Sequence, residues 1–320
     1  MDWSTAGVLM VATRAVHFTA TAITVGNIIF RNVIALPVLR LEVTTATPFR
    51  KQALLVSLLI SWLALAVSVI SGVVWLVLQA MSMSGMPFRE TLTTDVFSTV
   101  VNQTQFGNVM VVRAVLAVCL AACLACDRIV IAQWLGLAAA LGFAATIAWT
   151  GHAGSTIGTL GYLHPGADAL HLIAAAAWIG GLVALISFLA LTHRNKATSL
   201  ARAAIERFST LGIASVAILL LSGIINAAIL VGSPRGLVVT EYGRVLLLKL
   251  GLFAVMLVFA GINRFRLTPR LASSDNEQRS LALRQLTRNS RIEIALGLGI
   301  LMLVGLLGTL HPAIHSSLNS

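Results

Sequence analysis

Long apolar segments dominate the chain, and short polar segments separate them. A helix needs about 20 apolar residues to cross the hydrocarbon layer of a bilayer. Eight segments meet this length, at 7–30, 53–79, 109–126, 129–149, 167–191, 210–231, 245–262 and 292–311. The pattern therefore predicts an all-α integral membrane protein with eight transmembrane helices.

Composition agrees with the pattern. Hydrophobic residues make up 58% of the 320 residues and charged residues only 10%, whereas a soluble domain carries about 25% charged residues. The three cysteines all lie within 119–126, too close together for a disulfide framework. The chain has no phosphate-binding loop motif, and we expect no enzymatic activity.

The distribution of Lys and Arg predicts the orientation. The segments at 31–52, 127–128, 192–209 and 263–291 hold 4, 1, 4 and 7 basic residues, and the alternate segments at 80–108, 150–166 and 232–244 hold 1, 0 and 2. Cytoplasmic loops are enriched in basic residues. The first set is therefore expected to be cytoplasmic, with both termini on the periplasmic side.

Histidines gather on the outer side of this topology. His193 alone is cytoplasmic, and the other six are expected in the outer half of the bilayer or just outside it: His17, His152, His164, His171, His311 and His315. His17 and His171 fall inside spans, where ionisable side chains are costly and usually functional.

The first four helices resemble the last four. R14-A-V-H-F-T-A-T-A-I-T-V-G26 matches D168-A-L-H-L-I-A-A-A-A-W-I-G180, and S71-G-V-V74 matches S222-G-I-I225. T104-Q-F-G-N-V-M-V-V-R113 matches T240-E-Y-G-R-V-L-L-L-K249, and T150-G-H152 matches T309-L-H311. The matches keep one order, with offsets of 154, 151, 136 and 159 residues. A tandem duplication is the simplest explanation.

The duplication predicts two four-helix repeats, at 1–152 and 153–320, related by a pseudo-twofold axis along the membrane normal. The equivalent pairs are His17 with His171, His152 with His311, Arg113 with Lys249, and Arg14 with Asp168. Symmetry allows His17 and His171 to face each other near the axis. Asp168 could form an ion pair with Arg14 inside the membrane.

Possible metal ligands lie on one face of each repeat. Met10, Arg14 and His17 are spaced i, i+4, i+7, and His164, Asp168 and His171 have the same spacing in the second repeat. Thioether and imidazole ligands together suit copper. His17 and His171 are therefore predicted to form a central metal site, with further candidate ligands at His152, His311, Met10 and His164. The alternative for Met10 is simple contact with lipid or a neighbouring helix.

Two further sulfur-containing segments could bind Cu(I). The outer segment M81-S-M-S-G-M86 carries Met81, Met83 and Met86, and a flexible thioether cluster could capture the ion outside the membrane. Cys119, Cys123 and Cys126 form one stripe on the inner half of their helix and could pass Cu(I) inward. Ordinary helix packing is the alternative explanation for the three thiols.

The stretch W178-I-G-G181 on a later helix is expected to allow close approach between helices.

These motifs resemble the copper resistance D (CopD, PcoD) family of bacterial inner-membrane proteins. The stretch from R207-F-S-T to T268-P-R-L271, with S222-G-I-I-N226, Y242-G-R-V-L-L-L-K249 and I262-N-R264, is similar to the family's core domain, at about 207–311. T104-Q-F-G107 before Arg113, G151-H-A153, D168-A-L-H171 and W178-I-G-G181 resemble its upstream helices. The resemblance implies copper transfer from periplasm to cytoplasm, with a separate CopC-like periplasmic copper-binding partner.

A rival hypothesis comes from a different class of protein. His17 and His171 at equal depth could be the axial ligands of a b-type haem, with Arg113 and Lys249 binding its propionates. This redox reading explains the two basic residues better than copper transport does. It explains the methionine segment and the cysteine stripe less well. A membrane scaffold without metal is a third possibility, against which the repeated polar residues inside the spans argue.

Overall fold

A computed structural model describes residues 5–40, 47–151, 160–312 and 314, and every regular element among them is helical. Eight helices in this part of the chain are long and apolar enough to cross a membrane, which confirms the predicted number. The elements are α1 (Thr5–Phe30), η1 (Arg31–Ala35), α2 (Leu36–Leu39), α3 (Thr47–Ser84), α4 (Phe88–Thr91), α5 (Thr94–Gln103), α6 (Gln105–Ala125), α7 (Val130–Ala145), η2 (Thr146–Thr150), α8 (Leu160–Arg194), α9 (Thr198–Val231), α10 (Pro234–Val239), α11 (Glu241–Ile262), η4 (Asn263–Leu267), α12 (Thr268–Arg270) and α13 (Asn276–Leu307).

Several helices are longer than the apolar segments that predict them. The segments at 192–209 and 263–291 are largely helical, because α9 begins at Thr198 and α13 at Asn276. Their Leu, Ala, Arg and Gln residues are good helix formers, so a helix can continue beyond the hydrocarbon layer. The structure also corrects the expectation for the methionine segment 81–86, which is helical up to Ser84. Met81 and Met83 belong to the last turn of α3, and the chain leaves the helix at Gly85, where φ is +66°.

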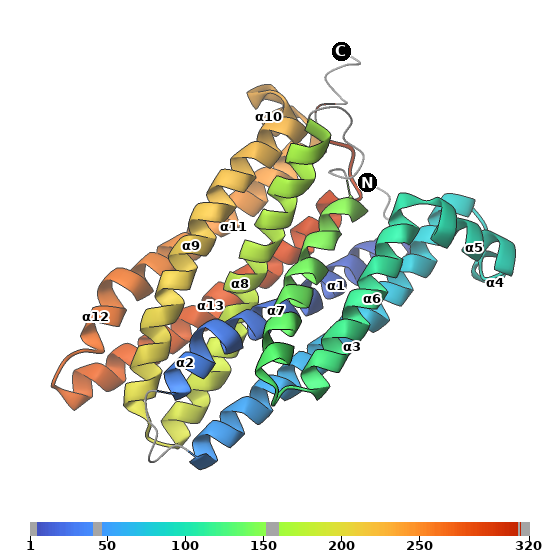
Figure 1. The fold of residues 1–320 in the computed structure, drawn as a ribbon. Helices are drawn as coiled ribbons and strands as arrows, with labels where there is room; N and C mark the ends of the chain where they lie inside the picture. The colour runs from blue at the N-terminus through green and yellow to red at the C-terminus, as the bar shows by residue number, and fades with distance from the viewer. Residues whose placement is uncertain (1–4, 41–46, 152–159, 313, 315–320) are drawn as a thin grey trace.

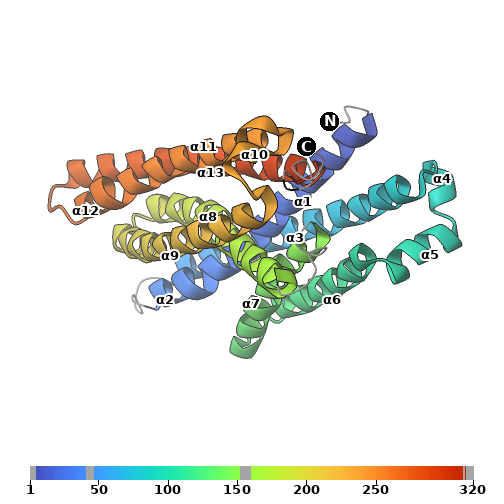
Figure 2. The same ribbon diagram turned by 90° about the horizontal axis from the view of Figure 1, so that it is seen from above.

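Helices α1 and α8 form the centre of the bundle. Buried residues make up 78% of the span of α1 and 67% of that of α8, against at most 39% for the other six spans. Helix α1 packs against α3 and α8, and α8 packs against α9. Figures 1 and 2 show α3, α6 and α7 on one side of this central pair and α9, α11 and α13 on the other. The start of α1 and the end of α13 lie at the same end as α10, and α12 lies at the opposite end (Figure 1).

The central pair touches backbone to backbone at two glycines. A Cβ atom added to Gly180 would collide with the carbonyl of Ala22, and one added to Gly26 would collide with the backbone of Ala176 and Gly180. Small residues at such crossings let helices approach closely in lipid. The expected role of the glycine-containing stretch after Trp178 is therefore confirmed at Gly180.

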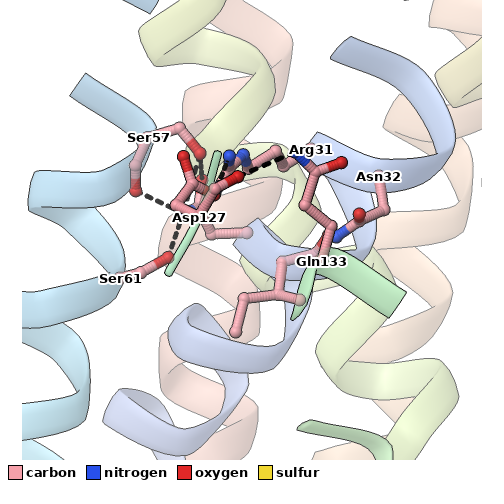
Figure 3. Close-up of polar contacts among 8 residues, drawn as sticks. Arg31, Asn32, Ser57, Ser61, Asp127 and Gln133 are labelled. Carbon is pink, nitrogen blue, oxygen red and sulfur yellow. Dashed lines mark hydrogen bonds and ion pairs between the residues drawn. The ribbon is translucent and has the colours of Figure 1, made fainter. Parts of the chain in front are cut away.

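A polar cluster ties η1 to the turn between α6 and α7. Arg31 is buried, with 4% of its side chain exposed, and forms an ion pair with Asp127 (Figure 3). Nearby, the Asn27 amide donates hydrogen bonds to the Ser57 carbonyl and to Ser61 Oγ, each at 2.7 Å. The π-helical turn places these polar groups inside the first half of the bundle, at the end opposite the termini.

Candidate functional site

The imidazole of His17 is held on both sides. Its Nδ1 lies 3.0 Å from the Ser68 carbonyl and 3.2 Å from Ser71 Oγ, and its Nε2 lies 2.8 Å from an Arg113 guanidinium nitrogen. A carbonyl only accepts and a guanidinium only donates. The ring is therefore neutral, with the proton on Nδ1, and its Nε2 lone pair is occupied by Arg113.

Arg113 makes four further contacts around this histidine. It donates to the Phe143 carbonyl at 2.5 Å, to Thr146 Oγ1 at 3.0 Å and to Thr21 Oγ1 at 3.2 Å. Its guanidinium also lies 4.1 Å from the centre of the Phe143 ring, a cation–π contact. Arg113 and His17 line one cavity of about 260 Å³, which we call the His17 cavity.

The Nδ1 atom of His171 has a serine partner, as in His17, but the surroundings of its Nε2 atom differ. Its Nδ1 lies 2.9 Å from Ser222 Oγ, which itself donates to the Ile218 carbonyl at 2.6 Å, so Nδ1 carries the proton. Among the described residues, Nε2 has no hydrogen-bond partner. A neutral imidazole whose Nδ1–H is bound to protein and whose Nε2 is open is the form that ligates metals.

His171 lines a larger cavity of about 380 Å³ between α8, α9, α11 and α13, which we call the His171 cavity. Its ionisable and amide side chains are His164, Asp168, His171, Asn226, Tyr242 and Lys249, with Arg14 also on its wall. The Asn226 amide donates to Asp168 at 3.1 Å, and the charges of Asp168 and Lys249 attract each other. The cavity therefore combines an open imidazole nitrogen with a carboxylate whose charge Lys249 offsets.

Arg14 does not form the expected ion pair with Asp168. Its guanidinium carbon lies 5.0 Å from the Trp75 ring and 5.6 Å from the Phe18 ring, and the side chain packs against Gly308. Asp168 takes Asn226 as its hydrogen-bond partner instead. Arg14 instead meets the end of α13 at Gly308, a tertiary contact that the repeat alone does not reveal.

The structure does not bring His17 and His171 to one cavity. Each ring hydrogen-bonds to the serine of a different helix, His17 to α3 and His171 to α9. An axial pair on one haem iron requires two free imidazole nitrogens facing each other, and Nε2 of His17 is engaged by Arg113. The residues present therefore do not fit the haem alternative.

The remaining predicted ligands are dispersed. Met10 packs at the edge of the main core, Met83 and Met86 are exposed, and Met81 is partly buried at the end of α3. Cys119 and Cys126 are exposed, Cys123 faces α7 near Gly136, and His311 is exposed beyond α13. His152 and His315 lie outside the described residues. No three His, Cys, Asp or Glu side chains in the described part come close enough to hold a metal ion together.

Sequence reasoning missed two buried residues of interest. Glu293 is 2% exposed and lies inside the span predicted at 292–311, where a single carboxylate in an apolar run was the available signal. Met256 is 1% exposed and lines the His171 cavity. It follows Lys249 by seven residues on α11, so helical spacing from that lysine could have identified it.

Eight membrane-length helices that enclose cavities lined by ionisable side chains are typical of a polytopic membrane protein. Sequence comparison then places the chain. Residues 3–162 match the family described as Copper resistance protein D-like, N-terminal domain, and residues 202–307 match Copper resistance protein D. The chain belongs to the copper resistance protein D family.

Individual relatives agree with this assignment. The chain is 31% identical to Copper resistance protein D of Pseudomonas syringae pv. tomato, over 79% of this chain and 83% of the relative. It is 34% identical to the inner membrane protein YebZ of Escherichia coli, over 68% and 74% of the two chains. It is 35% identical to the copper transport protein CutJ of Bacillus subtilis, over 48% of this chain and 26% of that longer one. No solved structure matches the chain.

Proposed function

We propose that the protein is a copper homeostasis protein of the bacterial inner membrane that moves copper from the periplasm to the cytoplasm through the His171 cavity. The observation that carries this proposal is the open Nε2 of His171, with its tautomer fixed by Ser222, on the wall of a cavity of about 380 Å³. The relatives named for copper resistance and copper transport support copper as the cargo, and YebZ supports the inner membrane.

The ligand chemistry of the cavity suits a passing copper ion. Imidazole and thioether groups bind copper, and His164, His171 and Met256 all line this cavity. Because no three of the conventional ligands converge among the described residues, we propose that the ion meets them in succession. A site that conducts must bind weakly enough to release its ion.

We propose that the two halves are repeats, at 1–152 and 153–320, and that the first has become a structural counterpart of the second. Both histidines contact a serine hydroxyl and a backbone carbonyl on the next long helix, and each ring abuts a glycine, Gly72 or Gly223. Thr104 and Thr240 cap α6 and α11 through 3.0 Å bonds from Gly107 and Gly243. Arg113 closes the site in the first half, and Lys249 leaves it open in the second.

We propose that the α12 end of the bundle is cytoplasmic and that both termini are periplasmic. The predicted cytoplasmic segments carry 16 basic residues and the periplasmic ones 3. Copper would then enter the His171 cavity from the periplasm, delivered by a separate CopC-like protein. The exposed methionines Met83 and Met86 at the end of α3 lie on that side in this orientation. The cysteine thiols line none of the cavities described above, so we leave them out of the route.

Copper uptake into proteoliposomes that contain a trapped Cu(I) chelator tests the proposal. His171→Ala should lower the uptake rate at least about tenfold, the effect of raising the barrier by about 1.4 kcal/mol. His311→Ala is the matched control because His311 is exposed and outside the cavity. Equal rates for wild type and His171→Ala would refute the site, and no protein-dependent uptake by wild type would refute import.

A further inference from the structure

A second cavity of about 380 Å³ lies at the α12 end of the same half, and Glu293 is on its wall. We call it the Glu293 cavity. Its lining comes from α8, α9, α13 and the turn from α11 through η4 to α12, where Arg264, Phe265 and Thr268 contribute. The cavity therefore reaches the end of the bundle, whereas the His171 cavity lies toward the α10 end.

Glu293 is a buried carboxylate whose hydrogen-bond donors are neutral. The Asn263 amide donates to it at 2.6 Å, and the Trp178 indole, on the wall of the same cavity, is a second neutral group that interacts with the carboxylate. Asn289 in turn donates to the side-chain oxygen Oδ1 of Asn263 at 3.0 Å, which orients the amide toward Glu293. Two neutral donors satisfy the oxygens but do not cancel a negative charge, and an uncompensated charge at this depth is costly.

Charged groups around Glu293 are few. Arg264 from η4 is the other charged side chain that lines this cavity, and it donates to Ser209 at 3.0 Å. Helices α8 and α9 present uncharged side chains to the cavity, including Trp178 and Ser209. On α1, which also packs against α13, Arg14 lies against Gly308, and Arg31 of the following turn η1 is paired with Asp127. Asp168, in contrast, shares its cavity with Lys249.

Trp178 stands between the two cavities. It is 3% exposed, it lines both the His171 cavity and the Glu293 cavity, and its ring packs edge-on against Phe253 at 6.0 Å between centroids. Leu220 is the other side chain common to both linings. Trp178 and Leu220 therefore form the boundary between the two cavities.

We propose that Glu293 is a proton-binding site that exchanges protons with the α12 side of the membrane, and that Trp178 separates it from the His171 cavity. A proton from that side adds to the carboxylate and gives the neutral acid, and it leaves to the same side. Protonation removes the uncompensated charge. This site goes beyond the copper function and does not depend on it.

Infrared difference spectroscopy of the full chain in lipid, recorded across a pH titration, tests the protonation. Acidification produces C=O bands from every carboxyl group that takes up a proton, and the chain has 11 Asp and Glu residues. We expect one component of these bands to be present in wild type and in Asp168→Asn and to be missing from Glu293→Gln, with the components of the other acids unchanged. The glutamine variant keeps a carbonyl oxygen for Asn263 and Trp178, so it should fold, as a thermal melt would verify. Identical titrating C=O bands in wild type and Glu293→Gln would overturn the proposal. Neither result involves copper, so failure here and failure of the copper function are distinguishable.

Thiol labelling tests the separating role of Trp178. In a protein with Cys119, Cys123 and Cys126 replaced by serine, Gly212→Cys places a thiol in the Glu293 cavity, where an added Cβ meets no atom within 4 Å. A membrane-impermeant thiol reagent should label it from the α12 side alone, and from both sides once Trp178→Ala is added. Ala227→Cys in the His171 cavity is the control, labelled from the α10 side in both backgrounds. Labelling of Gly212→Cys from the α10 side with Trp178 intact, or no labelling from the α12 side, would overturn the separation.

Discussion

Arg113 donates a hydrogen bond to Nε2 of His17 across 2.8 Å, and this one contact distinguishes His17 from His171, which the sequence predicts to be its equivalent. A guanidinium on the imidazole lone pair leaves no room for a metal ion there. At the matching place in the second half stands Lys249, which attracts Asp168 and leaves His171 open. We therefore propose that the His17 site stabilises the bundle and that the His171 site binds the cargo.

His17→Ala should lower the free energy of unfolding by about 2 kcal/mol, because Arg113 loses a charge-assisted hydrogen bond inside the bundle. Copper uptake per folded molecule should stay close to that of wild type. Denaturation of the purified protein in detergent, together with the uptake assay, measures both quantities. The two-histidine site expected from the sequence would regain support if His17→Ala abolished uptake without affecting stability.

Asp127→Asn should destabilise the protein by about 3–5 kcal/mol, because it leaves the buried Arg31 guanidinium without its anion. Glu206→Gln is the matched control. Glu206 pairs with Arg202 one helical turn away, but both side chains are 47% exposed, and such pairs contribute about 0.3–0.5 kcal/mol. Chemical denaturation curves of both variants give their free energies of unfolding. Equal losses in the two variants would show that the buried Arg31–Asp127 pair stabilises the protein no more than an exposed pair does.

Gly180→Val should prevent native packing of α1 against α8, since even a Cβ atom collides with the Ala22 carbonyl. The loss in free energy of unfolding should exceed the value of about 1–3 kcal/mol that is typical of overpacked cores, because backbone atoms rather than side chains must move. Gly251→Ala offers the control, as an added Cβ there meets nothing within 4 Å. Size-exclusion profiles and thermal melts report the outcome; a native melt for Gly180→Val would contradict the close contact.

Ser273→Cys and Ser84→Cys should react with an impermeant thiol reagent from opposite sides of the membrane, Ser273→Cys from the cytoplasm. Ser273 follows α12 and Ser84 ends α3, and the basic residues predict that these ends face the cytoplasm and the periplasm. The measurement uses intact cells and inverted vesicles in the background without native cysteines. Labelling of Ser273→Cys in intact cells would reverse the orientation.

Replacement of Cys119, Cys123 and Cys126 by serine should leave copper uptake unchanged, because two of these thiols are exposed and none lines the cavities of the proposed route. The proteoliposome assay with the trapped chelator measures the rate. A marked loss would restore the thiol stripe as an inward path for Cu(I), as the sequence alone suggests.

Apolar run length and motif order were enough to predict the eight spans, the family and the two intramembrane histidines. Run length failed where helices extend into polar sequence, as at Asn276, since backbone hydrogen bonding there does not require apolar side chains. The state of each imidazole nitrogen was beyond prediction, because it depends on which side chain of α6 or α11 reaches the ring. Glu293 escaped notice for a different reason: it has no counterpart in the repeat, and comparison of the halves draws attention to matched residues.

The contact between Gly26 and Gly180 also limits how the molecule can move. With no side chains between them, the backbones of α1 and α8 interlock, so one half cannot slide along the other without separating the helices. Turning about that contact keeps it intact. A change in the crossing angle between α1 and α8 would then widen one end of the bundle and narrow the other.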